Sequence, residues 1–243
     1  MKRKTVSLSL ILLTVFAGLL LLQINACKKS SDDNTPPSAG IKDFDGNVYH
    51  TVTIGQQVWL VENLKATHYR NGDPVNKAQL FKSGFTTDTS GAYLNYRNSD
   101  SIAQIYGRLY NFWAGTDPRG LAPVGFHVPS DAEWSAMEAY LGNDSLTGGK
   151  LKETGTTHWA SPNINATNSS GFTALPAGSY AGFFGYVGLG NWTSLWTSTS
   201  TSTWYADARG MVNTTGIIGG ANLGDGCKLN FFSIRCVQDP LKK

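Results

Sequence analysis

The 243-residue chain has few charged side chains, and their signs balance once its first residues are set aside. Charged residues make up 15% of the chain. Three of the 20 Lys and Arg residues (Lys2, Arg3 and Lys4) lie at the N-terminus, which leaves 17 cations against 17 acidic residues. Without a net positive field, a protein does not attract phosphate backbones over a distance. The composition therefore argues against nucleic acid as a partner.

Residues that usually carry catalysis or bind metal ions are also scarce. The four histidines (His50, His68, His127 and His158) show no metal-ligand spacing such as HxxxH. No GxSxG or HExxH motif occurs, although a hydrolase needs a paired acid and base or a nucleophile beside a positioned histidine. We therefore expect a protein that is not an enzyme, with a hydrolase or a copper-dependent oxidase as the alternative.

The one long apolar run lies at the N-terminus. Residues 1–26 join a basic start to the run VSLSLILLTVFAGLLLL, which is typical of a signal peptide. The tetrad INAC that ends at Cys27 resembles the bacterial lipobox, so we expect Cys27 to be lipidated. An uncleaved transmembrane anchor is the alternative, because the run is near the spanning length of about 20 residues.

A polar, proline-containing segment follows the lipidation site. Residues 27–40, which include KKSSDDNTPPSAG, have no apolar periodicity and predict a flexible tether. The segment resembles the charged stretches that mark surface export in Bacteroidota. We therefore expect an outer-membrane lipoprotein at the cell surface, attached to the membrane through its lipid.

Residues 41–243 have the composition of one globular domain. Short apolar runs are broken by NG, DG, GD and GG pairs, which mark turns. VYHTVTIGQQVWLVENL predicts two strands joined at Gly55-Gln56, and helical periodicity occurs near 101–115 and 131–141. The pattern predicts a single irregular, loop-rich α+β domain with small antiparallel sheets and about two helices.

The stretch PVGFHVPSDAEWSAMEAYL (123–141) groups a histidine, an aspartate and two glutamates. It could form a catalytic or metal site, but Ser130 and Glu133 have the spacing of a capping box. The apolar residues that follow fall on one helical face, and we expect Glu138 to face solvent. The residues therefore predict the start of a helix.

Aromatic residues are frequent in a glycine-rich part of the chain. Flat rings can stack on sugar faces while neighbouring polar groups bind hydroxyls. This predicts a glycan or polysaccharide ligand, with a protein-binding, structural or adhesive role as the alternative. Burial of the same rings in the core would also explain them. The candidate ligand-binding residues are Tyr186, Trp192, Trp196, Trp204 and Tyr205.

Two further sites follow from residue type. Cys227 and Cys236 form a pair in an oxidising compartment, which favours a disulfide, with a thiol metal site as the alternative. Asp43, Asp45 and Asn47 place oxygens at alternate positions, as calcium loops do. Calcium is therefore a possible cofactor, although a tight turn explains these residues as well.

Six sequence blocks of the chain resemble motifs of the Fibrobacter succinogenes major paralogous domain family, and they occur in the same order. The blocks are DFDGNVYHTVTIGQQVWLVENL (43–64), GRLYNFWA (107–114), PVGFHVPSDAEW (123–134), GGKLKETGTTHW (148–159), SGFTALPAGSY (170–180) and FFSIRCV (231–237).

The resemblance implies, more remotely, a fold similar to C-type lectins and formylglycine-generating enzymes. It implies no activity. Many members of the family carry a cysteine where this chain has Ala122, and that cysteine is expected to pair with the one at the position of Cys236. Cys227 would then serve as the replacement partner.

Overall fold

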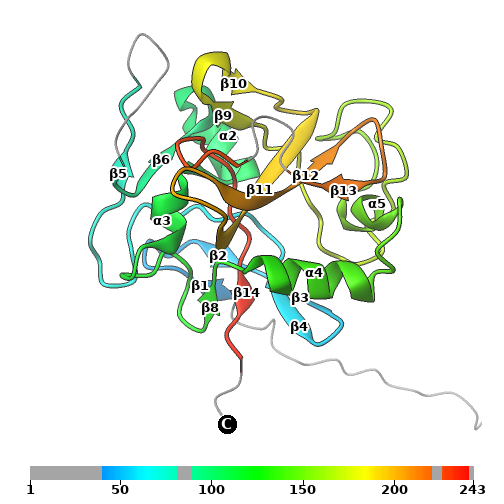
Figure 1. Cartoon of the computed structure of the whole chain (residues 1–243), viewed down its shortest axis with the longest axis horizontal. Coiled ribbons are helices and arrows are strands. Elements are labelled where there is room, and N and C mark those ends of the chain that lie inside the picture. Colours follow the sequence, from blue (N-terminus) through cyan, green and yellow to red (C-terminus); the bar gives the residue numbers. More distant parts are fainter. Residues whose placement is uncertain (1–39, 81–88, 221–225, 241–243) are drawn as a thin grey trace, which may run out of the picture. The chain divides into compact units, whose positions relative to one another are not determined.

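The computed structural model describes residues 40–80, 89–220 and 226–240, whose strands form five small sheets (Figure 1). Four α-helices and long loops connect them, which confirms the predicted loop-rich α+β fold. The strands are β1 (Ile41–Lys42), β2 (Val48–Tyr49), β3 (Thr51–Ile54), β4 (Gln57–Leu60), β5 (Asn76–Lys77), β6 (Ala92–Leu94), β7 (Leu109–Tyr110), β8 (Phe126–His127), β9 (Ser179–Ala181), β10 (Gly185–Val187), β11 (Trp192–Ser200), β12 (Ala206–Val212), β13 (Ile218–Gly219) and β14 (Val237–Gln238). The helices are α2 (Asp100–Tyr106), α3 (Phe112–Thr116), α4 (Asp131–Tyr140) and α5 (Thr147–Leu151), with 3₁₀ turns η1 (Tyr96–Asn98) and η2 (Gly182–Phe184).

The predicted signal peptide, tether and lipidated Cys27 lie outside the described residues. A compact unit begins at Gly40, next to the predicted domain start at Ile41. Among the residues that are described, none of the helices has the length and apolar character needed to cross a membrane.

The helix predicted near 101–115 is divided in the structure into α2, β7 and α3. Gly107 ends α2 with a φ of 81°, and a Cβ there would lie 2.6 Å from the Cβ of Asn63. Only glycine adopts this conformation at so close a contact without strain. The chain therefore turns at Gly107 into β7, and the sequence pattern alone did not show this break.

The hairpin predicted around Gly55-Gln56 is confirmed. β3 and β4 pair in antiparallel register from Thr51↔Leu60 to Ile54↔Gln57. The hairpin belongs to a four-stranded sheet with the order β3-β4-β14-β8, so a strand near the C-terminus lies between two strands from much earlier in the chain.

The long hairpin β11–β12 separates two parts of the hydrophobic core. Leu195 packs with Trp59, Trp134 and Phe172, whereas the next residue, Trp196, packs in another cluster. Successive side chains of a strand point to opposite faces, so one strand serves both clusters. Helix α4 lies along one side of this hairpin (Figure 1).

The segment 230–237 runs through the centre of the fold and is buried along its whole length. Its backbone pairs with several distant segments, through the bridges Tyr180↔Phe231, Tyr110↔Phe232 and Leu195↔Ser233. Neighbouring residues of this segment belong to all three hydrophobic clusters. The segment therefore connects all three parts of the core.

Arg235 is the buried cation of this segment. Its Nε and Nη2 donate to the Asn63 side-chain oxygen at 3.0 and 2.9 Å, and its Nη1 donates to the Phe172 carbonyl at 2.6 Å and the Leu60 carbonyl at 3.3 Å. Its guanidinium lies 4.4 Å from the Phe172 ring centroid. No carboxylate within the described ranges pairs with Arg235, so neutral oxygens and a ring face compensate its burial.

Lys152 is bound in the same way. Its side chain is fully buried, and Nζ donates to the backbone carbonyls of Ile164, Val212 and Thr215 at 2.9, 2.9 and 2.8 Å. Burial lowers the pKa of Lys152 to about 8. One ammonium group thus fixes the loop around Ile164 to the end of β12.

The predicted helix start at Ser130 is confirmed as a complete capping box. The Ser130 hydroxyl accepts from the Glu133 amide at 3.3 Å, and the Glu133 carboxylate accepts from the Ser130 amide at 2.7 Å. Glu133 also binds His127 at 2.8 Å, and the other nitrogen of that imidazole contacts Asp239 at 2.8 Å. His127 thereby connects the start of α4 to the segment after β14.

The prediction that Glu138 faces solvent is wrong. Its carboxylate accepts from Arg209 of β12 at 2.6 Å, and Asp131 binds the same guanidinium at 2.6 Å. The two acids are seven residues apart, so they lie on one face of α4. The pair fastens the helix to the long hairpin, a contact that local periodicity could not reveal.

Replacing Arg235 by methionine should lower the free energy of unfolding by roughly 3 kcal/mol, because three buried oxygens lose their donor. Arg119→Met provides the control, since Arg119 is partly exposed and pairs with exposed Asp73 and with Asp117. Its loss should stay below about 1 kcal/mol. Urea denaturation measures both values, and equal losses would contradict the role given to Arg235.

Glu133→Gln should destabilise the protein at neutral pH and much less in acid. Partial burial raises the pKa of Glu133, but hydrogen bonds from Ser130 and His127 outweigh it and hold that pKa below its usual 4.5. The ionised carboxylate therefore stabilises the fold above pH 4.5 and loses this effect as the pH falls through its lowered pKa. Urea titrations should show a difference of about 1 kcal/mol at neutral pH. A difference that persists in acid would contradict this account.

Candidate functional site

The tip of the β11–β12 hairpin is a five-residue loop, 201–205, that follows an irregular end of the ladder. Trp196 pairs with Ala208 and Ser200 pairs with Ala206, so β11 contains extra residues between these two pairs. Such a bulge bends a strand and redirects the side chains beyond it. The loop therefore leaves the plane of the hairpin.

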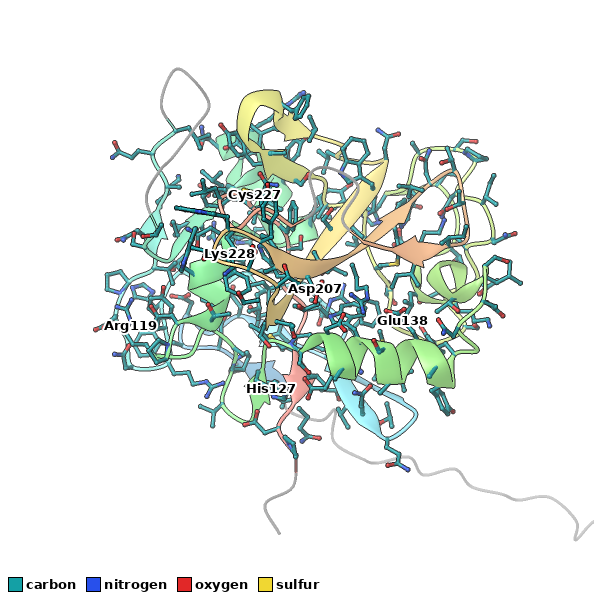
Figure 2. The ribbon with its side chains drawn as sticks, in the orientation of Figure 1. Arg119, His127, Glu138, Asp207, Cys227 and Lys228 are labelled. Atoms are coloured by element: carbon teal, nitrogen blue, oxygen red, sulfur yellow. The ribbon has the colours of Figure 1, made fainter. Side chains whose placement is uncertain are left out.

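Lys228 fixes this loop through its side chain and its backbone. Its ammonium group donates to the Ser200 hydroxyl at 2.7 Å, the Ser202 carbonyl at 2.6 Å and the Thr203 carbonyl at 3.3 Å. Its backbone amide donates to the Trp204 carbonyl at 2.9 Å. Nζ also lies 4.8 Å from the ring centroid of buried Phe112, so the clamp rests on the core (Figure 2 labels Lys228). All three ammonium donors are used.

Two adjacent aromatic side chains project from the clamped loop. Trp204 is 54% exposed and Tyr205 is 46% exposed, although rings of this size are usually well buried. The Ser202 hydroxyl accepts from both of their backbone amides, at 3.3 and 3.1 Å. The rings are thus presented to solvent on a backbone that is already ordered.

A cavity of about 360 Å³ lies beside Tyr205. Asp207 and Thr201 are the polar residues of its wall. Small residues line the rest, namely Ala206, Ala208, Gly220 and Gly226. Tyr205 and Asp207 are two residues apart on an extended backbone, which places their side chains on the same face. No hydrogen bond or ion pair to the Asp207 carboxylate occurs in the described part of the chain. The carboxylate is therefore available to a ligand.

Comparison with known proteins identifies the family of the chain. The sequence profile of the Fibrobacter succinogenes major domain family matches residues 52–238. The chain belongs to this family. No curated protein and no solved structure matches it, so the likeness to C-type lectins stays a prediction.

The blocks that identify this Fibrobacter succinogenes major domain lie mainly in its core. Trp59, Trp134 and Phe172 come from three blocks and pack together, with ring centroids 4.9 to 5.8 Å apart. Arg235, from the last block, binds Phe172 as well. The clamped loop lies between the block at 170–180 and the block at 231–237. The blocks that carry the family resemblance thus contribute to the core, whereas the clamped loop lies outside them.

The five predicted aromatic ligand residues do not form one site. Trp196 is 1% exposed, and its indole nitrogen donates to the Tyr110 carbonyl at 2.8 Å, so the prediction is wrong for this residue. Its ring packs against Phe232 in the core. Tyr186 and Trp192 are half-buried near β9–β10, where Tyr186 contacts Tyr96 and Tyr180. Only Trp204 and Tyr205 lie together on the surface.

In the predicted calcium loop, both carboxylates accept hydrogen bonds from groups of the protein. Asp43 accepts from the Asn47 amide at 2.9 Å, the Asn47 side chain at 2.8 Å and the Tyr49 hydroxyl at 2.7 Å. Asp45 turns away from these groups and accepts from Thr67 and His68. The oxygens diverge, so a tight turn accounts for the motif. Across the described ranges, no three His, Cys, Asp or Glu residues are arranged to hold a metal ion.

A larger groove of about 850 Å³ lies between the β3–β4 hairpin, α4 and the segment after β14. Its aromatic wall is Tyr140, which is 67% exposed. Its two carboxylates, Glu133 and Asp239, are both bound by His127. The groove therefore offers one ring and no free charge, whereas the cavity offers the Tyr205 ring and a free carboxylate, with the exposed Trp204 next to Tyr205 in the sequence.

The predicted disulfide between Cys227 and Cys236 is absent, and both cysteines are free. Cys227 faces Tyr205 across an isolated bridge at the clamped loop, whereas Cys236 is fully buried beside Leu60. Between them the chain turns at Cys227–Asn230 and then runs extended through the core. Six extended residues span about 20 Å, which is far beyond disulfide reach.

Sequence reasoning missed Asp207 and Lys228 at this site. The position of Asp207 could have been inferred, because it follows Tyr205 by two residues in an alternating pattern. No local signal marks Lys228, because its contacts are to a loop more than 20 residues earlier in the chain.

Alkylation should distinguish Cys227 from Cys236 by their reactivity. Cys227 is partly exposed and should react with iodoacetamide in the folded protein. Cys236 should react only after unfolding, because burial raises the pKa of its thiol and excludes the reagent. Site-resolved mass spectrometry measures both. Protection of both thiols until a reductant is added would instead demonstrate a disulfide.

Proposed function

We propose that the protein is an envelope-anchored lipoprotein that binds a glycan or polysaccharide on the surface formed by Trp204, Tyr205 and Asp207. The observation that carries the proposal is the pair of exposed aromatic rings on a loop clamped by Lys228, next to a cavity with a free carboxylate. We refer to this surface as the Trp204–Tyr205 site.

The chemistry of sugars matches these groups. The C–H face of a pyranose ring packs on a flat aromatic face, and its hydroxyls accept or donate hydrogen bonds at the rim. Asp207 and Thr201 lie where such hydroxyls would be placed. Because Lys228 has already ordered the loop, binding costs less conformational entropy than it would on a free loop.

Binding is favoured over catalysis by the state of the histidines. Each one contacts a carboxylate at 2.5 to 2.9 Å: His50 contacts Glu62, His68 contacts Asp45, His158 contacts Glu153 and His127 contacts two acids. The Thr67 hydroxyl lies 3.2 Å from Nδ1 of His68, but the same nitrogen binds Asp45 at 2.5 Å and is not free to take the hydroxyl proton. The Trp204–Tyr205 site itself contains no histidine.

Anchoring to the membrane rests on the first 40 residues. The signal-like run, the lipobox and the tether together support lipidation at Cys27 and display at the outer face of the outer membrane. A tethered domain of this kind meets polymers in the surroundings of the cell, which agrees with a ligand that is a glycan.

Trp204→Ala and Tyr205→Ala should each weaken glycan binding about tenfold, because each removes one stacking surface. Phe184→Ala is the matched control, since Phe184 is an aromatic residue that is 70% exposed outside the site. A glycan array identifies the ligand, and calorimetry on the variants measures the change. Binding that is lost equally in all three variants would refute the site. Surface crosslinking to proteins, with no glycan bound, would favour the adhesive alternative.

A further inference from the structure

Two cations near the Trp204–Tyr205 site are already engaged by contacts within the protein. Lys228 uses its three ammonium donors on Ser200, Ser202 and Thr203. Arg209, two residues beyond Asp207 on the same face of β12, binds Glu138 and Asp131 at 2.6 Å each. Lys228 has no ammonium donor left, and two carboxylates balance the charge of Arg209. The described residues therefore give the site no free ammonium group and no unpaired guanidinium for a carboxylate or sulfate group.

Asp207, in contrast to these cations, has a side chain that no described residue engages. It is half-buried at the wall of the cavity, and neither Lys228 nor Arg209 forms an ion pair with it. In the described ranges, its side chain also has no hydrogen-bond donor. A half-buried carboxylate keeps a stronger field than an exposed one, because less water screens it. Asp207 therefore places a carboxylate without an ion-pair partner among the described residues at the cavity wall.

The ring of Tyr205 adds to this field. Tyr205 lines the same cavity as Asp207, and the face of an aromatic ring carries partial negative charge. A cation above the ring face is attracted to it, most strongly when water is excluded. A ring face and a carboxylate that line one cavity are together suited to an ammonium group (Figure 2 labels Asp207 and Lys228).

We infer that the Trp204–Tyr205 site selects glycans that carry free amino groups, with Asp207 as the residue that determines this specificity. The inference rests on the proposed glycan-binding function and names the substrate class. The rings provide binding to the sugar face, which any pyranose can use. Asp207 adds a contact that only an ammonium group fully satisfies, and it repels uronic acids and sulfated sugars.

The test compares three oligosaccharides of equal length by calorimetry, with the full-length protein purified in detergent. They are oligomers of glucosamine, of N-acetylglucosamine and of galacturonic acid. At about pH 6 the amine of glucosamine carries its proton, while the N-acetyl form is neutral and the uronic acid is anionic. We expect glucosamine oligomers to bind about tenfold more tightly than the N-acetyl form. Galacturonic acid oligomers should not bind.

Two variants separate charge selection from stacking. Asp207→Asn should bring the affinities for the amino and N-acetyl oligomers within about twofold, because the amide keeps the shape and loses the charge. Asp73→Asn is the matched control, because it removes an exposed charge that pairs with Arg119 away from the cavity. It should leave the preference unchanged. The preference should also shrink when salt is raised from about 0.05 M to about 0.5 M.

The failures are distinguishable. If N-acetyl oligomers bind as tightly as glucosamine oligomers, and Trp204→Ala abolishes both, the proposed function stands and the selection by Asp207 is refuted. A preference that survives Asp207→Asn also refutes it. If no oligomer binds and a glycan array is blank as well, the proposed function and the inference fall together.

Discussion

The guanidinium of Arg235 connects segments that are distant in the sequence, and the rest of the fold is arranged around it. It binds the Asn63 side chain, which follows β4, and the backbone carbonyl of Phe172, which precedes β9. Asn63 in turn donates to the Tyr106 carbonyl at the end of α2. With so little regular secondary structure, few ladders hold these segments together. A buried cation with fixed donors takes over that task, at the cost of its own desolvation.

The same solution recurs at Lys152 and Lys228. All three cations bind at least two backbone carbonyl oxygens, and none of them pairs with a carboxylate in the described ranges. Carbonyls in irregular loops lack the partners that a helix or sheet would provide, so they must be satisfied in another way. A loop-rich chain with few charged residues can therefore place several of its cations inside. This arrangement explains how the fold orders long loops without the disulfide expected from the two cysteines.

The sequence predicted features that depend on neighbouring residues. The capping box at Ser130 and the β3–β4 hairpin are local, and both are confirmed. Contacts between segments that are distant in the sequence could not be predicted from local patterns. Trp196 was expected at a ligand site because aromatic residues are frequent in this glycine-rich part of the chain, yet the alternation of β11 turns it into the core. The contact between Glu138 and Arg209 depends on how α4 packs on the hairpin, which no periodicity encodes.

The clamp at Lys228 has a consequence for how this surface could diversify. Apart from the Ser200 hydroxyl, Lys228 holds the loop through the backbone oxygens of residues 202–204. Backbone oxygens remain in place when side chains are exchanged. Much of the loop can therefore accept new side chains without losing its shape, in the way that an antibody framework carries variable residues. A lineage with many copies of this domain could vary its ligands at positions 203–205 while keeping one anchor and one core.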